Sequence, residues 1–84
     1  MKEFKDLKFK DNVLSPSSAS LFFDNNYGVS VITGRGSYTD INNPYEVAVL
    51  YDGELCYTTH ITNDVLGYQT KESVSTIMKQ IQEL

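Results

Sequence analysis

The chain has 84 residues, which is enough for one domain with a modest hydrophobic core. Hydrophobic residues make up 40% of it and charged residues 21%, a balance typical of a folded globular protein and not of a disordered one. No stretch approaches the roughly 20 apolar residues that span a bilayer, so we expect no membrane contact. The first twenty residues lack the apolar core of a signal peptide, and the single cysteine, Cys56, excludes an internal disulfide. Both features favour a reducing, cytoplasmic setting.

The net charge of −4 is unevenly distributed along the chain. The first ten residues contain four lysines and two acids, whereas the rest contains three basic residues and nine acids. An acidic body disfavours a non-specific phosphate-binding surface. It favours a basic partner, such as the nucleic-acid channel of another protein.

Residues 1–18 predict an N-terminal edge strand followed by a loop. Leu7 and Phe9 alternate with lysines, as in a short strand at the edge of a sheet. A frayed helical turn is the alternative. Residues 12–18, with Pro16 among serines, are typical of a connecting loop.

Residues 19–59 predict two β-hairpins, of which the first is formed by residues 19–24 and 27–33. Asn25 and Asn26 join its two strands, and asparagine tolerates left-handed backbone better than most residues. Apolar side chains fall on both faces of this hairpin.

The second hairpin, residues 45–59, is the strongest local signal in the chain. Asp52-Gly53 lies between two runs of β-branched and aromatic residues, which predicts a two-residue type I′ turn. In its first strand one face carries Tyr45, Val47, Val49 and Tyr51, and the other carries Glu46, Ala48 and Leu50.

The connections on either side of this hairpin are irregular in sequence. Residues 33–44 are rich in turn formers and longer than most hairpin loops, so we predict a mobile loop there. After the hairpin, Asn63 or Asp64 is expected to cap one short helical turn that ends at Gly67.

Residues 71–84 predict an amphipathic helix. Thr70 is a suitable N-cap and Glu72 suits the positive first turn. The expected buried stripe is Val74, Ile77, Met78, Ile81 and Leu84. The sequence therefore predicts an α+β fold: an antiparallel β-meander of four to five strands with one C-terminal α-helix packed across one face.

One helix covers one face of a sheet, so the other face is expected to carry exposed rings. Depending on the strand registers, the residues expected there are some combination of Phe22, Ile32, Tyr45, Tyr51 and Tyr57. Six tyrosines and no tryptophan suit a surface that is soluble when free and becomes apolar when docked. The alternative is that the tyrosines cover an ordinary solvated face of an antiparallel sheet.

Polar residues add candidates to this face. Arg35, the only arginine, lies in a Gly-Arg-Gly segment that lacks the spacing of a phosphate-binding loop. It is instead a candidate contact hot spot, and the alternative is an arginine exposed by chance. Four acidic residues are expected to form a rim around the face, or else an ordinary solvated surface: Asp40, Glu46, Asp52 and Glu54. The candidate partner-binding residues are Arg35, Tyr38, Asp40, Tyr45, Glu46, Tyr51, Asp52, Glu54 and Tyr57.

The sequence offers no complete catalytic or metal-binding set. Cys56 and His60 are about 13 Å apart if both lie on one extended strand, beyond hydrogen-bonding distance. Two such ligands also fall short of the three or four that zinc requires. We therefore expect no enzymatic activity, no cofactor and no metal.

Several segments together resemble a family of small uncharacterised proteins encoded by bacteriophages, over residues 20–84. The segments are Tyr27-Gly-Val-Ser-Val31, Ser37-Tyr38, Tyr45-Glu-Val-Ala-Val-Leu50, Leu55-Cys-Tyr-Thr58, Ile61-Thr62, Asp64-Val-Leu-Gly-Tyr68 and the final helix. The chain departs from that family after Tyr38, where residues 39–43 replace a more glycine-rich loop. The resemblance implies a phage origin and supplies no activity or site residues.

The leading hypothesis is a non-enzymatic phage protein that binds and inhibits a host protein in the host cytoplasm. An anti-CRISPR or another counter-defence or takeover factor, with a nucleic-acid-binding defence effector as its target, is the form expected. One alternative is a homodimeric structural or virion-assembly protein joined through the open sheet face. Another is weak nucleic-acid binding through the basic N-terminus, with the residues Lys2, Lys5, Lys8, Lys10, Phe4 and Phe9.

Overall fold

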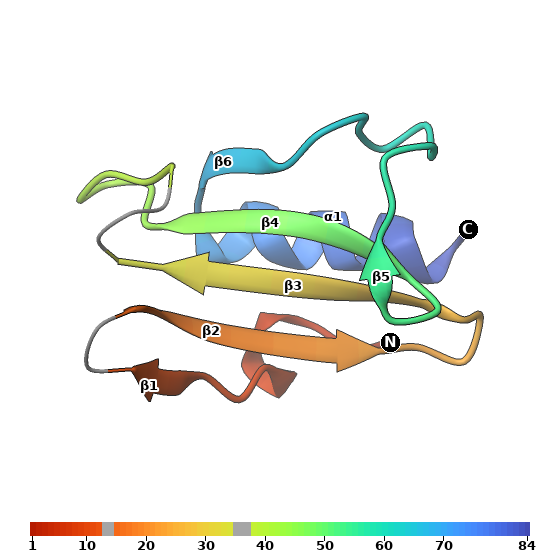
Figure 1. Cartoon of the computed structure of the whole chain (residues 1–84), viewed down its shortest axis with the longest axis horizontal. Helices are drawn as coiled ribbons and strands as arrows, with labels where there is room; N and C mark the ends of the chain where they lie inside the picture. The colour runs from red at the N-terminus through yellow and green to blue at the C-terminus, as the bar shows by residue number, and fades with distance from the viewer. Residues whose placement is uncertain (13–14, 35–37) are drawn as a thin grey trace.

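The computed structural model describes residues 1–12, 15–34 and 38–84 of the chain. It is an α+β fold in which one C-terminal helix packs against an antiparallel sheet, as predicted (Figure 1). The elements are η1 (Phe4–Asp6), β1 (Lys10–Asn12), β2 (Ser15–Phe22), β3 (Tyr27–Thr33), β4 (Tyr45–Tyr51), β5 (Glu54–Leu55), β6 (Leu66–Gln69) and α1 (Lys71–Gln82). The strand order is β1-β2-β3-β4, and both β5 and β6 pair with the far edge of β4.

Both predicted hairpin turns are present. Asp52 and Gly53 have φ angles of 54° and 86°, the positive values that a type I′ turn requires at both central positions. Asn26 has a φ of 71°. Its turn is closed by a hydrogen bond that the Phe23 N–H donates to the Tyr27 carbonyl at 2.8 Å. The turn residues therefore fix the register of the two hairpins.

The N-terminal region differs in part from the expectation. A 3-10 turn forms at Phe4–Asp6, as in the alternative, and an edge strand, β1, follows it. The strand predicted at Leu7 and Phe9 is wrong for these two residues, because β1 begins at Lys10. The loop predicted over residues 12–18 is wrong for residues 15–18, which belong to β2. Ser17 and Ser18 pair with Thr33 and Ile32 of β3, and this ladder outweighs the weak strand preference of serine.

The short helical turn predicted at Asn63 or Asp64 is also wrong. The Thr62 hydroxyl accepts from the Asp64 N–H at 3.1 Å, and such local side-chain bonds compete with helix formation. Gly67 does not end a helix but lies in β6, where a Cβ atom would come within 2.7 Å of the Tyr38 Cβ atom. Glycine is required there because the segment at Tyr38 packs directly against the strand.

Helix α1 forms the core with one face of the sheet. Thr70 caps it by accepting from the Ser73 N–H at 3.2 Å, as predicted. The predicted stripe of Val74, Ile77, Met78 and Ile81 is buried, and Leu84 packs at its margin. The stripe meets a layer of valines from the two central strands, namely Val29, Val31, Val47 and Val49.

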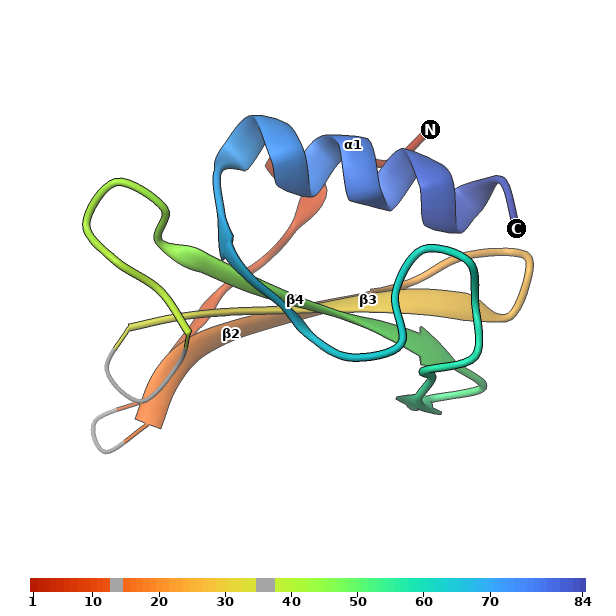
Figure 2. The same ribbon diagram turned by 90° about the horizontal axis from the view of Figure 1, so that it is seen from above.

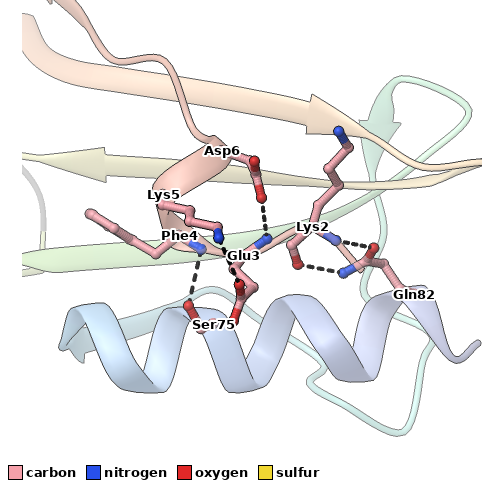
Figure 3. A network of polar contacts seen from close by, with 7 residues as sticks. All are labelled: Lys2, Glu3, Phe4, Lys5, Asp6, Ser75 and Gln82. Atoms are coloured by element: carbon pink, nitrogen blue, oxygen red, sulfur yellow. Dashed lines mark hydrogen bonds and ion pairs between the residues drawn. The ribbon is translucent and has the colours of Figure 1, made fainter.

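The N-terminal segment lies beside α1 on the same side of the sheet (Figure 2). The Gln82 side chain bonds both the N–H and the carbonyl of Lys2, each at 2.8 Å, and the Phe4 N–H donates to the Ser75 hydroxyl at 3.0 Å (Figure 3). At the C-terminal end of the helix, next to Gln82, the Asn25 amide donates to the Ile81 carbonyl at 2.9 Å. Helix and N-terminal segment thus form one layer over the sheet. No helix of the described part is long and apolar enough to cross a membrane.

Candidate functional site

The face of the sheet that points away from α1, here called the open face, is set by the alternation of side chains along each strand. Residues next to the core valines in sequence point to it. They are Ser18, Ser20 and Phe22 of β2, Gly28, Ser30 and Ile32 of β3, and Glu46, Ala48 and Leu50 of β4. Ala48 and Leu50 are buried without belonging to the core cluster under α1, which agrees with this assignment.

At the hairpin end of the open face, apolar residues form a continuous line across four strands. Phe22 pairs with Gly28, Gly28 with Leu50, and Leu50 with Leu55. We call Phe22, Leu50 and Leu55 the apolar row. Its two ends are exposed, Phe22 by 61% and Leu55 by 58%, whereas Leu50 between them is only 7% exposed. The exposed apolar area of the row therefore lies at its two ends.

Gly28 has no side chain and so leaves room for the Phe22 ring within this row. A Cβ atom at Gly28 would lie 2.9 Å from the Cδ1 atom of Phe22 and 2.8 Å from the Leu21 carbonyl oxygen. The Phe22 ring therefore occupies the space over Gly28, the residue that lies between Phe22 and Leu50 in the row. A side chain at this position would displace the ring from the row.

Acidic residues flank the row at the two hairpin turns. Asp24 lies two residues after Phe22, Asp52 lies in the Asp-Gly turn and Glu54 follows that turn, and all three are exposed. The described residues of β2 through β6 and of their connections include no lysine or arginine. Lys2 and Lys5 of the N-terminal segment lie across a hollow of about 470 Å³ that Phe22 and Asp24 also line.

The candidate residues named from the sequence fall at opposite ends of the sheet. Tyr51, Asp52 and Glu54 lie at the hairpin end, with Tyr51 opposite Tyr27, whereas Glu46 lies opposite Ile32 at the other end of the same two strands. Tyr38 and Asp40 lie near Glu46, whose carboxylate accepts from the Tyr38 N–H at 3.0 Å. A strand of this length separates the two groups by about 20 Å. They do not form one site, and Arg35 lies outside the described residues.

Of the residues from which the open face was expected to be drawn, Tyr45 and Tyr51 do not belong to it. Both share the parity of the core valines and point toward the helix layer. Tyr45 contacts the rings of Phe4 and Phe9, with centroids 5.0 and 5.9 Å away, and Tyr51 contacts Tyr27 at 4.8 Å. Phe22 and Ile32 do point to the open face, as expected, and Tyr57 is exposed beyond β5.

The same aromatic cluster bears on the nucleic-acid hypothesis. Phe4 and Phe9 are half-buried against each other and against Tyr45, so their rings are engaged within the protein. Base stacking needs an open ring face. The lysines of this segment remain exposed, but the aromatic part of that hypothesis has no support.

At the far end of the sheet, Asp40 shapes its own turn. Its carboxylate accepts from the backbone N–H groups of Asn42 and Asn43 at 2.9 and 2.7 Å. This closed turn presents Ile41, which is 94% exposed. Asp40 and Glu46 thus serve the local backbone, and the predicted mobility of residues 33–44 stays a prediction.

Cys56 and His60 are not on one straight strand, because β5 ends at Leu55. The Cys56 thiol lies 3.5 Å from the Thr58 hydroxyl, and hydrogen bonds from Thr58 lower the pKa of the thiol. Within the described residues, no three His, Cys, Asp or Glu side chains gather as a metal site would need.

Sequence reasoning missed Leu55, Leu50 and Asp24 as members of a site. The Asp-Gly turn contained the signal, because a two-residue turn at Asp52 places Leu50 opposite Leu55. No family model, curated protein or solved structure matches the chain. The resemblance to bacteriophage proteins therefore stays a prediction, and the function has to be inferred from the open face.

Proposed function

We propose that this chain is a non-enzymatic phage protein that binds a host protein through the hairpin end of its open face and inhibits it. The observation that supports this most is the apolar row, in which Phe22 and Leu55 are exposed on either side of buried Leu50. These two large apolar side chains are held in water at the two ends of one row. Such a cluster commonly marks an interaction surface.

The energetics suit a docking role. Burying an exposed Phe or Leu side chain is worth about 1.5–3 kcal/mol before the costs of association are subtracted. Two such anchors in a row, held in place by the β-ladder, form a small hot spot with little conformational entropy to lose. The serines on the same face, beside the row, form a polar border that remains hydrated.

The charge of the surroundings indicates the class of partner. Asp24, Asp52 and Glu54 border the row, and a surface with this rim is complementary to an apolar patch surrounded by lysine or arginine. Nucleic-acid-binding proteins carry such basic surroundings. A chain of this size that occupies a nucleic-acid channel excludes the substrate from it, which is the action expected of an anti-CRISPR or a related counter-defence factor.

The test is affinity capture from a bacterial lysate with three forms of the chain. Wild type is compared with Leu55→Ser, which removes one exposed anchor, and with Ile41→Ser, which removes an equally large exposed residue at the far end of the sheet. We expect wild type and I41S to retain the same host protein, and L55S to retain at least tenfold less of it. The captured protein is then assayed for nucleic-acid binding with and without the chain.

Two results would overturn the proposal. One is equal capture by wild type and L55S together with loss in I41S, which would place binding at the far end of the sheet. The other is a captured protein whose activity is unchanged by saturating amounts of the chain.

A further inference from the structure

The outer edge of β2 is unpaired over its last residues. Strand β1 pairs with β2 only as far as Ser18, opposite Lys10, while β2 continues to Phe22. The Phe23 N–H points to β3, since it donates to the Tyr27 carbonyl. Successive residues of a strand direct their backbone groups to opposite sides, so the N–H and C=O groups of Ser20 and Phe22 point outward. No backbone or side-chain partner for them is found within the described residues.

This edge lacks the usual protection. Natural edge strands carry lysine, proline or a bulge that prevents pairing with another chain. Residues 19–22 are Ala-Ser-Leu-Phe, with no charge and no proline. The opposite edge of the sheet is different, because β5 has two residues and the outer side of β6 is engaged where the Tyr68 N–H donates to the Tyr38 carbonyl at 2.9 Å.

We propose that the β2 edge pairs with the same edge of a second copy of this chain, antiparallel and about a twofold axis beside Phe22. Two antiparallel strands related by a twofold axis present matching donors and acceptors, so an edge with two outward residues is complementary to itself. A hollow of about 470 Å³ lies beside Phe22 and Asp24, and Lys2 and Lys5 of the N-terminal segment line its other side.

The position of β1 selects the register. If the axis passed beside Leu21, Asp24 of the second copy would fall opposite Ser18, where Lys10 already lies. With the axis at Phe22, each Phe22 faces its symmetry mate and Asp24 of the second copy lies opposite Ser20. The second copy then turns away at Asn25 and Asn26, clear of β1.

This pairing goes beyond the proposed function and is independent of it, but it changes the surface that a partner meets. The two Phe22 rings lie on the open face, so the two apolar rows join into one row of twice the length. Specific interfaces bury about 800 Å² on each partner, and this area is large for one short row of side chains. The joined rows of two copies offer a partner more apolar area than the row of one copy.

Disulfide trapping tests the geometry directly. Phe22→Cys and Leu55→Cys are each made in a Cys56→Ser background and oxidised with glutathione disulfide. The two positions are similarly exposed and lie on the same face, at opposite edges of the sheet. A hydrogen-bonded antiparallel pair holds its Cα atoms about 5.5 Å apart, within the range that a disulfide spans. We expect the F22C variant to form a covalent dimer about tenfold faster than the L55C variant.

Sedimentation equilibrium gives a second measurement on a chain that keeps its phenylalanine. Ser20→Pro removes an outward N–H without touching the β2–β3 ladder, whereas Ser20→Ala keeps it. We expect S20P to be monomeric and S20A and L55S to self-associate like wild type, with folding of each checked by circular dichroism. Equal trapping of F22C and L55C, dissociation by L55S, or a wild-type chain that stays monomeric at about 1 mM would overturn the pairing.

Discussion

The backbone N–H of Asp52 donates to the carbonyl of Asn26 at 2.8 Å and joins the two hairpin turns at one end of the sheet. Both residues hold left-handed backbone, with φ angles of 54° and 71°. The bond places the β2–β3 turn against the β4–β5 turn. It therefore fixes the two ends of the apolar row, and the acids beside them, relative to each other. The candidate surface is therefore held in shape by its turns.

The left-handed backbone at Asp52 limits which residues are tolerated at this position. Asparagine tolerates this conformation well, whereas a residue with an ordinary Cβ and no short polar side chain costs about 1–2 kcal/mol there. We expect Asp52→Ala to lower the free energy of unfolding by that amount in urea titration, and Asp52→Asn to change it little. Equal stability of the two variants would contradict the assignment of this turn.

Gly28 is expected to be the least replaceable glycine of the open face. Gly28→Ala forces a Cβ atom against the Leu21 carbonyl and the Phe22 ring, and overpacking of this kind costs about 1–3 kcal/mol. Ser30→Ala, at the next position on the same strand and face, is the matched control and should be nearly neutral. Thermal unfolding compares the two, and a neutral G28A would mean that the ring does not lie over the glycine.

Asn25 links the first turn to the end of α1. Its amide donates to the Ile81 carbonyl and its oxygen accepts from the Tyr27 N–H at 3.1 Å. We expect Asn25→Ala to cost about 1–3 kcal/mol, because the helix end and the turn each lose a partner. Asn63→Ala, an exposed position in a loop, serves as control in the same denaturant titration. A loss no larger than that of N63A would show that the link is not used.

The Cys56 thiol is expected to react at lower pH in the folded chain than in the unfolded one. Hydrogen bonds from Thr58 favour the thiolate and lower its pKa, so the thiolate persists to lower pH. The rate of iodoacetamide alkylation, followed against pH, should have its midpoint below that of the urea-unfolded chain. Thr58→Val should move the midpoint upward, and an unchanged midpoint would contradict the role of Thr58.

Much of the fold was predictable because the signals were local. The Asp52-Gly53 and Asn25-Asn26 turns and the periodicity of residues 71–84 each depend on a few neighbouring residues. The strand at residues 15–18 was not predictable, because its serines are ordered by ladders on both sides. The irregular stretch near Asp64 was also missed, because side-chain bonds and the contact of Gly67 with Tyr38 are tertiary features.

The candidate site was harder to predict than the fold. Alternation separated Tyr45, Val47 and Val49 from Ala48 and Leu50, but both groups are apolar. Which group meets the helix depends on how well each packs against the stripe on α1, and that is decided in three dimensions. Once the valine face is covered, Tyr45 follows it inward, and Leu50 is left for the open face.

Amide hydrogen exchange of the chain, free and bound to the protein that affinity capture retains, tests the central claim most directly. The account predicts slower exchange on binding at the hairpin end of the open face, around Phe22, Leu50 and Leu55. The turn at residues 40–43 and the outer face of α1 should exchange as they do in the free chain. Protection confined to that turn or to α1, with none at the apolar row, would contradict it.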